Sequence, residues 1–384
     1  MKLPGRPSTL DDAFVVTDPD NSVKNATADP SAPAATESTS RPSRGHFWIR
    51  RLGALGRVAT AAAALVQPVA RLCARLDWRA DLLVHFQDAA IVVTIIAIAA
   101  TIRRWPLVAF TLVAVAVWQA SALWTFNGVN PVPAVANRTS PRIRLLVANV
   151  LCTNRNYAQL ERLIKEERPD IVGLVEVSPE WIEGLHDIRA EYPFRAEVPW
   201  GAFGLALWFR RQPIRVDPPA QSTPGGWPFL HAVFRFEGRD RELWLAHPSS
   251  PLRASRKIRG YPELITLAER VRDASGSRIV AGDFNTSEAS PYFGDLLAIS
   301  GLRDSRRGFG RQPTWPSMIP LRVAIDHVLV SDDWAVLDRR VGNSIGSDHF
   351  PLILDLGVAA GAEADASAVK APSSHGQSVS VALP

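Results

Sequence analysis

The stretch Ile279-Val280-Ala281-Gly282-Asp283-Phe284-Asn285 is a short apolar run that ends in a carboxylate and a carboxamide. Such a run is typical of a buried strand, and residues two apart on a strand face the same side. Asp283 and Asn285 would then share one edge of a sheet, where they could hold a water, a metal ion or a phosphate oxygen. The same residues also fit a strand-to-turn junction with two Asx turns, so the tetrapeptide alone leaves both interpretations open.

The chain from residue 141 onward alternates short apolar runs with amphipathic segments. Strands are expected at 143–149, 171–175, 204–209, 229–236, 243–246, 279–281, 324–330 and 352–356, and helices at 157–167, 255–274 and 291–298. Many of these strands end on side chains that can coordinate a metal or handle a proton: Asn149, Glu176, His247, Asp283 with Asn285, Asp326 with His327, and Asp348 with His349. Because ligand sites of sheet proteins form where strand ends converge, these positions together predict one site.

The composition excludes several classes of protein. The chain has 384 residues and a formal net charge of +5, supplied by scattered arginines and not by a dense basic block that would mark a nucleic-acid arm. Two cysteines far apart, Cys73 and Cys152, exclude a disulfide framework and a cysteine-based zinc site. Residues 1–46 and 358–384 are rich in small and polar residues and are predicted to be disordered tails.

Residues 47–126 are predicted to be a membrane region with two or three transmembrane helices, at about 52–72, 82–102 and 106–126. The last is long enough to cross about 30 Å of hydrocarbon and has Gln119 as its only strongly polar side chain. The second carries His85, Gln87 and Asp88 near its beginning, close to an interface. The first contains arginines and a proline, so it either spans the membrane or lies on its surface. A buried helical bundle of a soluble protein is the alternative for each.

The loop Arg103-Arg104-Trp105-Pro106 indicates the orientation. Positive charge in a short loop favours the cytoplasmic side. The last span would then run outward, so that a linker at 127–140 and a domain at 141–357 would be extracytoplasmic. The chain is therefore predicted to be a multi-pass cell-membrane protein, with the lipid bilayer as a partner and no obligate protein partner evident.

The order of the motifs resembles that of the endonuclease/exonuclease/phosphatase superfamily, which includes deoxyribonuclease I, apurinic endonucleases, sphingomyelinases and inositol polyphosphate phosphatases. The matching segments are Leu146-Val-Ala-Asn149, Pro169-Asp-Ile-Val-Gly-Leu-Val-Glu176, Leu245-Ala-His247-Pro248, Gly282-Asp-Phe-Asn285, Ala324-Ile-Asp326-His327 and Gly346-Ser-Asp348-His349. The apolar helices, His247-Pro-Ser-Ser-Pro251 and Thr314-Trp315-Pro316 are similar to the membrane-anchored bacterial subgroup, although Val175 stands where many members have Gln. The resemblance implies a four-layer α/β sandwich, in which two packed mixed sheets have helices outside.

The resemblance and the residue chemistry assign the metal site to three of these residues. Glu176 is the expected ligand of a hard divalent ion such as Mg²⁺, with Mn²⁺ as an alternative, because such ions prefer carboxylate oxygens. Asn149 would assist the metal or contact the phosphate. Asp348 would add a second hard oxygen.

The other residues are expected to act on water and phosphate. Asp283 and Asn285 would position and deprotonate the attacking water, and Asn285 could also donate to the phosphate. Asp326 and His349 would form an orienting pair, since a carboxylate bound to one ring nitrogen fixes the tautomer and favours the cationic imidazole. His247 is the other imidazole expected to contact the phosphate.

His327 is expected to be structural although it belongs to the Ile-Asp-His motif. It alternates away from Asp326 along the strand, so the two side chains should lie on opposite faces. Asp170 is likewise expected to cap the turn before its strand.

These assignments predict a membrane-anchored, divalent-metal-dependent phosphoesterase that hydrolyses a phosphodiester, phosphomonoester or pyrophosphate outside the cytoplasm by metal-assisted water attack. A lipid-linked phosphate suits the tether, because anchoring concentrates enzyme and substrate on one surface. Nucleic acid is the alternative substrate, with candidate grips at Arg253, Arg256, Lys257 and Arg259 and at Arg303, Arg306, Arg307 and Arg311. A non-catalytic binding module that retains the fold is the other alternative, but it predicts broken motifs.

Overall fold

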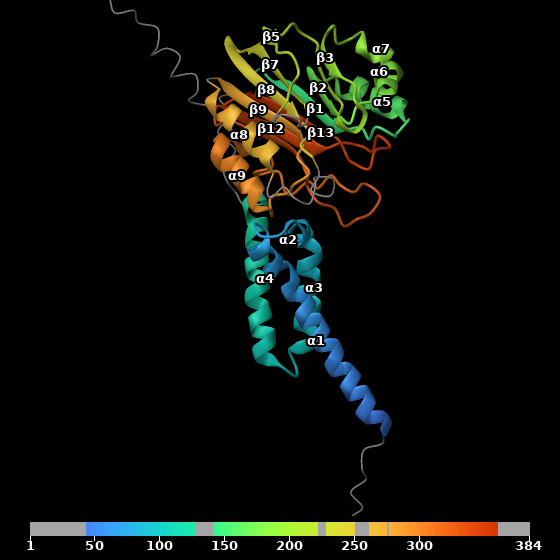
Figure 1. Ribbon diagram of the computed structural model, residues 1–384, viewed down its shortest axis with the longest axis vertical. Helices are drawn as coiled ribbons and strands as arrows, with labels where there is room; N and C mark the ends of the chain where they lie inside the picture. The colour runs from blue at the N-terminus through green and yellow to red at the C-terminus, as the bar shows by residue number, and fades with distance from the viewer. Residues whose placement is uncertain (1–43, 128–140, 222–227, 250–260, 275, 360–384) are drawn as a thin grey trace, which may run out of the picture. The chain divides into compact units, whose positions relative to one another are not determined.

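The computed structural model describes residues 44–127, 141–221, 228–249, 261–274 and 276–359 (Figure 1). The predicted tails at 1–46 and 358–384 and the predicted linker at 127–140 therefore lie almost wholly outside the described residues. The chain divides into two units, Met1–Arg51 and Leu52–Pro384. The first unit contributes only the beginning of helix α1 to the description, and the second holds all the other elements.

Four helices occupy the region that the sequence predicts to be membrane-embedded: α1 (Arg44–Cys73), α2 (Trp78–Val84), α3 (Gln87–Thr101) and α4 (Pro106–Asn127). One helix, over Trp48–Cys73, is long and apolar enough to cross a membrane. Helices α2 and α3 pass this test only as a pair, bent by 74°, and Pro106–Ser121 of α4 is a shorter apolar helix. Among the described residues there is thus one such helix, or two if the bent pair is one span, where the sequence predicts two or three.

The predicted span at about 82–102 is interrupted in the structure, where α2 ends at Val84 and α3 begins at Gln87. Polar side chains at the break find partners in the domain that follows. His85 Nδ1 lies 2.8 Å from Ser287 Oγ, and the carboxylate of Asp88 pairs with Arg311. A straight helix in hydrocarbon would leave such groups unsatisfied at a cost of several kcal/mol each, so these contacts favour the break.

Helices α1, α3 and α4 are joined by a buried set of polar groups around Gln119. Its Oε1 accepts a hydrogen bond from Thr94 Oγ1 over 3.1 Å, and its Nε2 donates to Gln67 Oε1 over 3.3 Å. Gln87 Nε2 donates to the backbone carbonyl of Gln119 over 2.7 Å. Hydrogen bonds between helices are typical of membrane packing, where polar side chains face one another inside the bundle.

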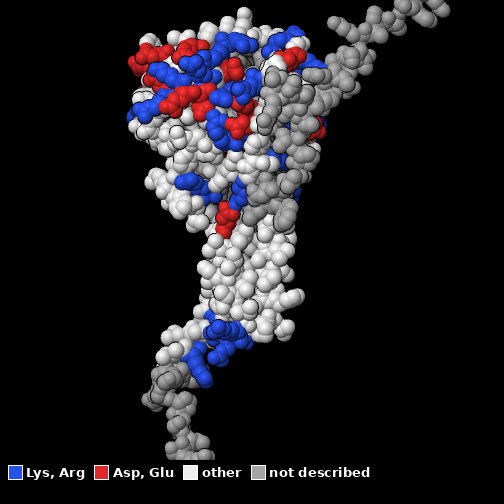
Figure 2. Space-filling view, turned by 180° about the vertical axis from the view of Figure 1, so that it is seen from behind, with Lys and Arg blue, Asp and Glu red and all other residues white. Residues whose placement is uncertain are grey.

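The outward surface of these helices is apolar. Leu107 and Phe110 on α4 and Ile95 and Ile96 on α3 are all more than half exposed. Figure 2 shows a stretch of the helices without charged side chains on this face, whereas both signs of charge gather over the domain that follows. Because soluble proteins rarely expose large contiguous apolar patches, this surface is typical of helices that contact lipid or another protein.

The rest of the chain forms two sheets. The first has the strand order β12-β13-β1-β2-β4-β3 and the second the order β10-β11-β9-β8-β7-β5, with β6 paired to β7. The strands of the first sheet are β1 (Ile143–Asn149), β2 (Ile171–Val175), β3 (Phe194–Val198), β4 (Leu205–Phe209), β12 (Trp334–Val341) and β13 (Leu352–Val358). Those of the second are β5 (Arg215–Val216), β6 (Ala220–Gln221), β7 (Pro228–Phe236), β8 (Arg239–Ala246), β9 (Ser277–Asp283), β10 (Arg303–Asp304) and β11 (Asp326–Val330).

The sheets pack face to face, with helices on both outer sides (Figure 1). Side chains from both sheets, such as Leu145 of β1 and Leu243 of β8, share one buried core. Helices α5 (Tyr157–Glu167), α6 (Pro179–Gly184) and α7 (His186–Arg189) cover the outer face of the first sheet. Helices α8 (Pro262–Asp273) and α9 (Pro291–Ser300) cover the second, and a 3-10 turn η1 (Gly201–Phe203) precedes β4. The predicted four-layer α/β sandwich is thereby confirmed.

Strand register brings the predicted strand ends to one edge of the sandwich. Strands β1 and β2 run parallel, so that Asn149 pairs with Val175 at the end of both. Strands β8 and β9 also run parallel, and β11 runs antiparallel to β9 with Asp326 opposite Asp283. Two parallel strands end at the same edge of a sheet, and an antiparallel neighbour begins at that edge. Side chains from distant segments of the chain therefore lie side by side there.

Candidate active site

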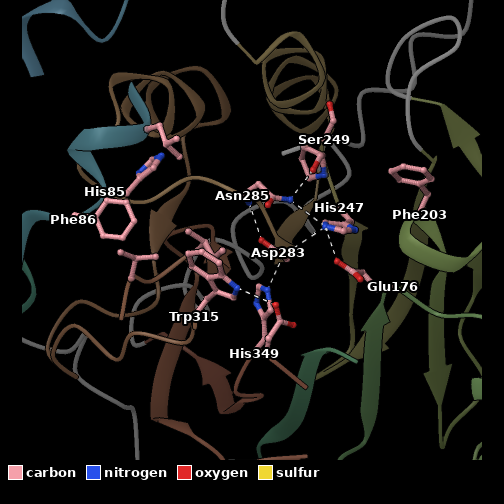
Figure 3. A pocket seen from close by; sticks show the side chains of 15 residues that line it. His85, Phe86, Glu176, Phe203, His247, Ser249, Asp283, Asn285, Trp315 and His349 are labelled. Atoms are coloured by element: carbon pink, nitrogen blue, oxygen red, sulfur yellow. Dashed lines mark hydrogen bonds and ion pairs between the residues drawn. The ribbon is translucent and has the colours of Figure 1, made fainter. Parts of the chain in front are cut away.

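One cavity of about 330 Å³ collects the strand ends of the sandwich (Figure 3). Six of the residues that the sequence predicts for the site line it: Glu176, His247, Asp283, Asn285, Asp348 and His349. Asn149 and Asp326 stand behind them and hydrogen-bond to lining side chains. The structure therefore brings together all eight residues that the sequence assigns to metal, water or phosphate.

The backbone at this edge adopts conformations that few residues tolerate. Gly282 has φ of 139°, and a Cβ there would lie 1.9 Å from the carbonyl oxygen of Ala246 on the neighbouring strand. Only glycine fits, which explains the residue before Asp283. Glu176 and Asn285 have φ of 60° and 52°. Non-glycine residues in this left-handed region are uncommon, and such strain clusters at functional sites.

Asp283 is the centre of the site's hydrogen bonds. Its Oδ2 accepts from Asn149 Nδ2 over 3.0 Å and lies 3.5 Å from His247 Nε2 and 3.6 Å from His349 Nε2. Its Oδ1 accepts from the backbone N–H of Asn285 over 2.8 Å. Burial opposes the charged carboxylate, but His349 and His247 outweigh it and hold the pKa of Asp283 well below its usual value. Asp283 is therefore an ionised acceptor at neutral pH.

His349 and Asp326 form the pair that the sequence predicts. His349 Nδ1 lies 2.8 Å from Asp326 Oδ2, which leaves Nε2 on the side of Asp283. Burial lowers the pKa of this imidazole, but the carboxylates of Asp326 and Asp283 outweigh burial and raise it to about 10. The ring is thus fixed in orientation and held as a cation beside the cavity.

His247 occupies the other side of Asp283. Burial opposes its charged form, but Asp283 and then Glu176, whose Oε1 lies 4.0 Å from Nε2, raise the pKa of His247. Asn285 Nδ2 lies 3.1 Å from the same ring nitrogen and donates to the Pro248 carbonyl over 3.0 Å. Because a cationic imidazole has no acceptor, Asn285 can donate to His247 only while His247 is neutral.

The carboxylates suit a hard divalent ion, although the structure arranges one predicted ligand differently. Asn149 turns its amide nitrogen toward Glu176, 3.1 Å from Oε1, while its oxygen accepts from the backbone of Leu151. In this arrangement the amide nitrogen of Asn149 faces the carboxylates, while its oxygen accepts one hydrogen bond and keeps a second lone pair. Glu176 and Asp348 both line the cavity with hard oxygens, which is the donor chemistry that such ions prefer.

A second group also has metal-binding spacing. One ligand atom from each of Asp283, Asp326 and His349 lies within 4.8 Å of the others, and all three residues are buried. Asp326 Oδ1 has no hydrogen-bond partner among the described residues. A cationic imidazole cannot ligate a metal, however, so His349 could join this group only after losing its proton.

Comparison with known families identifies this arrangement. The model of the endonuclease/exonuclease/phosphatase family matches residues 146–349, which is more than half of the chain. The chain belongs to this family. It is therefore a metal-dependent phosphoric ester hydrolase by class. Enzymes of the endonuclease/exonuclease/phosphatase family use divalent metals, and the acidic side chains at this site are the donors that such ions prefer.

Solved structures of the endonuclease/exonuclease/phosphatase family are similar in fold. A family protein from Leptotrichia buccalis C-1013-b is 18% identical, with a TM-score of 0.46, over 56% of this chain and 99% of that chain. TDP2 of D. rerio complexed with single strand DNA product is 17% identical, with a TM-score of 0.46, over 56% and 99%. The human Nocturnin catalytic domain with bound sulfate anion is 18% identical, with a TM-score of 0.46, over 57% and 94%. No curated protein matches the sequence significantly.

The arginines proposed as nucleic-acid grips are largely taken up in the protein. Arg306 is fully buried, and its guanidinium pairs with Asp304 and Glu288. Arg311 pairs with Glu288 and Asp88. This part of the predicted grip is therefore wrong, because carboxylates inside the fold already occupy these guanidinium groups. The other candidate group, at 253–259, lies outside the described residues.

Other residues line the cavity that sequence reasoning did not assign to the site. Trp315 donates from Nε1 to Asp348 Oδ2 over 3.1 Å and so orients a predicted metal ligand. Its place beside Pro316 is notable in the sequence, but nothing there indicates Asp348 as its partner. The remaining lining residues without an assigned role are Leu82, His85, Phe86, Phe203 and Val323, together with Pro248, Ser249 and Ile325, which stand inside the quoted motifs.

Proposed function

We propose that this chain is a membrane-anchored, divalent-metal-dependent phosphoesterase whose catalytic domain lies outside the cytoplasm. The observation that carries the activity is the single cavity in which carboxylates of Glu176, Asp283 and Asp348 face the imidazoles of His247 and His349. Hard anions beside two imidazoles that can donate hydrogen bonds can accommodate a phosphate group together with a metal ion. A non-catalytic module has less support, since every motif position is present and assembled.

The proposed reaction assigns one task to each group. Asp283, ionised between two imidazoles, accepts a hydrogen bond from the attacking water, and Asn285 positions the water or donates to the phosphate. His247 and His349 stabilise the charge that develops on the phosphoryl oxygens, with Asp326 fixing the His349 ring.

Glu176 and Asp348 are the proposed ligands of the metal, which we take to be Mg²⁺, with Mn²⁺ as the alternative. When bound, the ion neutralises negative charge on the phosphoryl oxygens. Asn149 supports this site from behind, because its amide nitrogen joins the carboxylates of Glu176 and Asp283.

The helices support the proposed anchoring and orientation. Arg103 and Arg104 follow α3, and short loops with positive charge favour the cytoplasm. Helix α2, at the other end of α3, hydrogen-bonds to the sandwich through Asp81. The positive loop at the end of α3 and the contact of α2 with the sandwich at its beginning both support a sandwich on the outer side of the membrane. A reporter fused to the C-terminus that is active only in the cytoplasm would refute this orientation.

The activity can be tested on the purified full-length chain in detergent. Bis(4-nitrophenyl) phosphate should be hydrolysed with Mg²⁺, and EDTA should abolish the reaction. Asp283→Ala should lose the activity, whereas Arg235→Ala, at an exposed position on β7 that does not line the cavity, should keep it. Full activity in Asp283→Ala, or no dependence on metal, would contradict the proposal.

A further inference from the structure

The cavity has a wall that the catalytic motifs do not supply. Leu82, His85 and Phe86, at the break between α2 and α3, line it together with the predicted catalytic residues. In Figure 3, His85 and Phe86 lie on one side of Asp283 and Phe203 on the other. The site is therefore polar at its centre and apolar at its flanks.

The break is held against the sandwich by a specific set of contacts. Asp81 is fully buried and accepts hydrogen bonds from Tyr261 Oη over 3.0 Å and from Ser290 Oγ over 2.7 Å. Arg75, just before α2, makes a bidentate pair with Asp295 of α9, over 2.7 and 2.8 Å. A buried carboxylate with two hydroxyl donors is costly to leave unpaired, so these bonds fix the wall in place.

The wall is followed directly in the chain by α3, which has exposed apolar side chains. Phe86 is 39% exposed and is followed directly by α3, on which Val92, Ile95 and Ile96 are exposed. His85 Nε2 has no hydrogen-bond partner among the described residues. An apolar chain that lay along α3 would therefore reach the cavity at Phe86.

The lining of the cavity indicates which substrates it suits. His247, His349, Asp283 and Glu176 form its polar centre. The apolar side chains of Leu82, Phe86 and Phe203 line the same cavity. These described residues suit a substrate with one phosphate group and an apolar remainder.

We infer that the α2–α3 break is a substrate-binding element and that the substrate is a phosphate ester of an apolar chain, presented by a lipid surface. This inference rests on the proposed phosphoesterase function. The phosphate lies at the imidazoles, and the carbons next to it lie against Leu82 and Phe86. Water oxygen bonds to phosphorus, one ester P–O bond breaks, and the leaving oxygen takes up a proton.

The test compares two diesters that differ only in the apolar group, dodecyl 4-nitrophenyl phosphate and methyl 4-nitrophenyl phosphate. Full-length protein in mixed micelles with Mg²⁺ should show a higher kcat/KM for the dodecyl ester. Leu82→Ala and Phe86→Ala should each lower the ratio of the two kcat/KM values about tenfold, because each removes apolar contact area. Partition into micelles is the same for all variants and cancels in this comparison.

Leu83→Ala is the matched control, since Leu83 neighbours Leu82 on α2 but is 46% exposed and does not line the cavity. It should keep the wild-type ratio. Phe86→Leu, which keeps an apolar side chain, should restore most of the ratio lost in Phe86→Ala if the latter is properly folded.

The other outcomes are decisive as well. An unchanged ratio in Leu82→Ala and Phe86→Ala, or faster cleavage of a single-stranded oligonucleotide than of the dodecyl ester, overturns this inference while the phosphoesterase function stands. Hydrolysis of none of the two diesters, the oligonucleotide, 4-nitrophenyl phosphate and pyrophosphate overturns the function itself.

Discussion

Strand β11 separates two histidine–aspartate pairs that have opposite surroundings. On one face, Asp326 Oδ2 lies 2.8 Å from His349 Nδ1, whose ring borders the cavity. On the other, the His327 ring packs between aromatic side chains, donates from Nε2 to the Thr286 carbonyl over 2.8 Å, and has Nδ1 3.7 Å from Asp304 Oδ2. Adjacent residues of one motif therefore serve a reactive site and a closed core.

Access to the cavity, and not residue type, distinguishes the two pairs. His349 lines the cavity, whereas His327 is fully buried beneath α9. A perturbed titratable group is a functional candidate only where a ligand can reach it. Substitutions on the two faces should therefore separate activity from stability.

The largest effect is expected for His349→Ala. Loss of a positioned cationic imidazole should lower kcat about 10²- to 10⁴-fold. Thermal stability should fall as well, because the change leaves the buried Asp326 carboxylate without its partner, so kcat is measured per folded molecule. Hydrolysis of bis(4-nitrophenyl) phosphate and a thermal melt check the two expectations. If His349→Ala had normal activity, or lost activity only because it unfolds, the two faces of β11 would not differ in function.

Asp304→Asn should act on stability alone. Arg306 Nε donates to Asp304 Oδ2 over 2.9 Å. The change removes the negative charge that balances the buried guanidinium of Arg306. Removing one partner of a buried ion pair costs about 3–5 kcal/mol. Denaturant unfolding should show this loss, while activity of the remaining folded protein stays normal.

The difference in unfolding free energy between wild type and Asp304→Asn should depend on pH, because the pKa of Asp304 is shifted in the folded protein. Burial opposes ionisation, but Arg306 and His327 hold the pKa well below its usual value. The carboxyl group has a lower pKa in the folded protein than in the unfolded chain, where the pKa is about 3.9. Its contribution to stability is therefore complete above about pH 3.9 and is lost as the pH falls toward the pKa of the folded state. The gap between wild type and Asp304→Asn should thus be constant from pH 8 to 5 and narrow below about pH 4.

His327→Ala should give a smaller loss of stability. It removes a buried ring and its bond to Thr286, and large-to-small changes of this kind cost about 2–5 kcal/mol. Turnover per folded molecule should equal that of wild type. A fall in kcat with normal unfolding would show that His327 acts in the site after all.

Asp326→Asn should have the smallest effect of the four. His349 stays in place but loses the carboxylate that orients its ring, and the loss of such a supporting partner typically costs about 10- to 100-fold. The measurement is kcat beside that of His349→Ala. A loss as large as that of His349→Ala would indicate that Asp326 contacts the substrate or metal directly.

The sequence predicts the part of the fold that positions the site. Strands β1 and β2 and helix α5 have the predicted bounds, because buried parallel strands are continuous apolar runs and α5 has a clear apolar face. Strands β3 and β12 were not predicted. They carry charged side chains such as Glu197 and Arg340 that make ion pairs, so their apolar signal is weak.

The break between α2 and α3 shows why the rest of the site was not predicted. The polar residues His85 and Asp88 are visible in the sequence, yet their partners lie some 200 residues further on. Local periodicity cannot indicate such partners. The apolar wall of the cavity depends on this same contact, and so it too is absent from the motifs.

The buried Asp81 constrains how the chain is made. Its partners Tyr261 and Ser290 lie 180 and 209 residues later, so neither exists when α2 leaves the ribosome. At about 5–20 residues per second, this carboxylate waits on the order of ten seconds or longer before its first partner is synthesised. The hydrogen bonds that join α2 to the sandwich through Asp81 can therefore form only after Tyr261 and Ser290 have been synthesised.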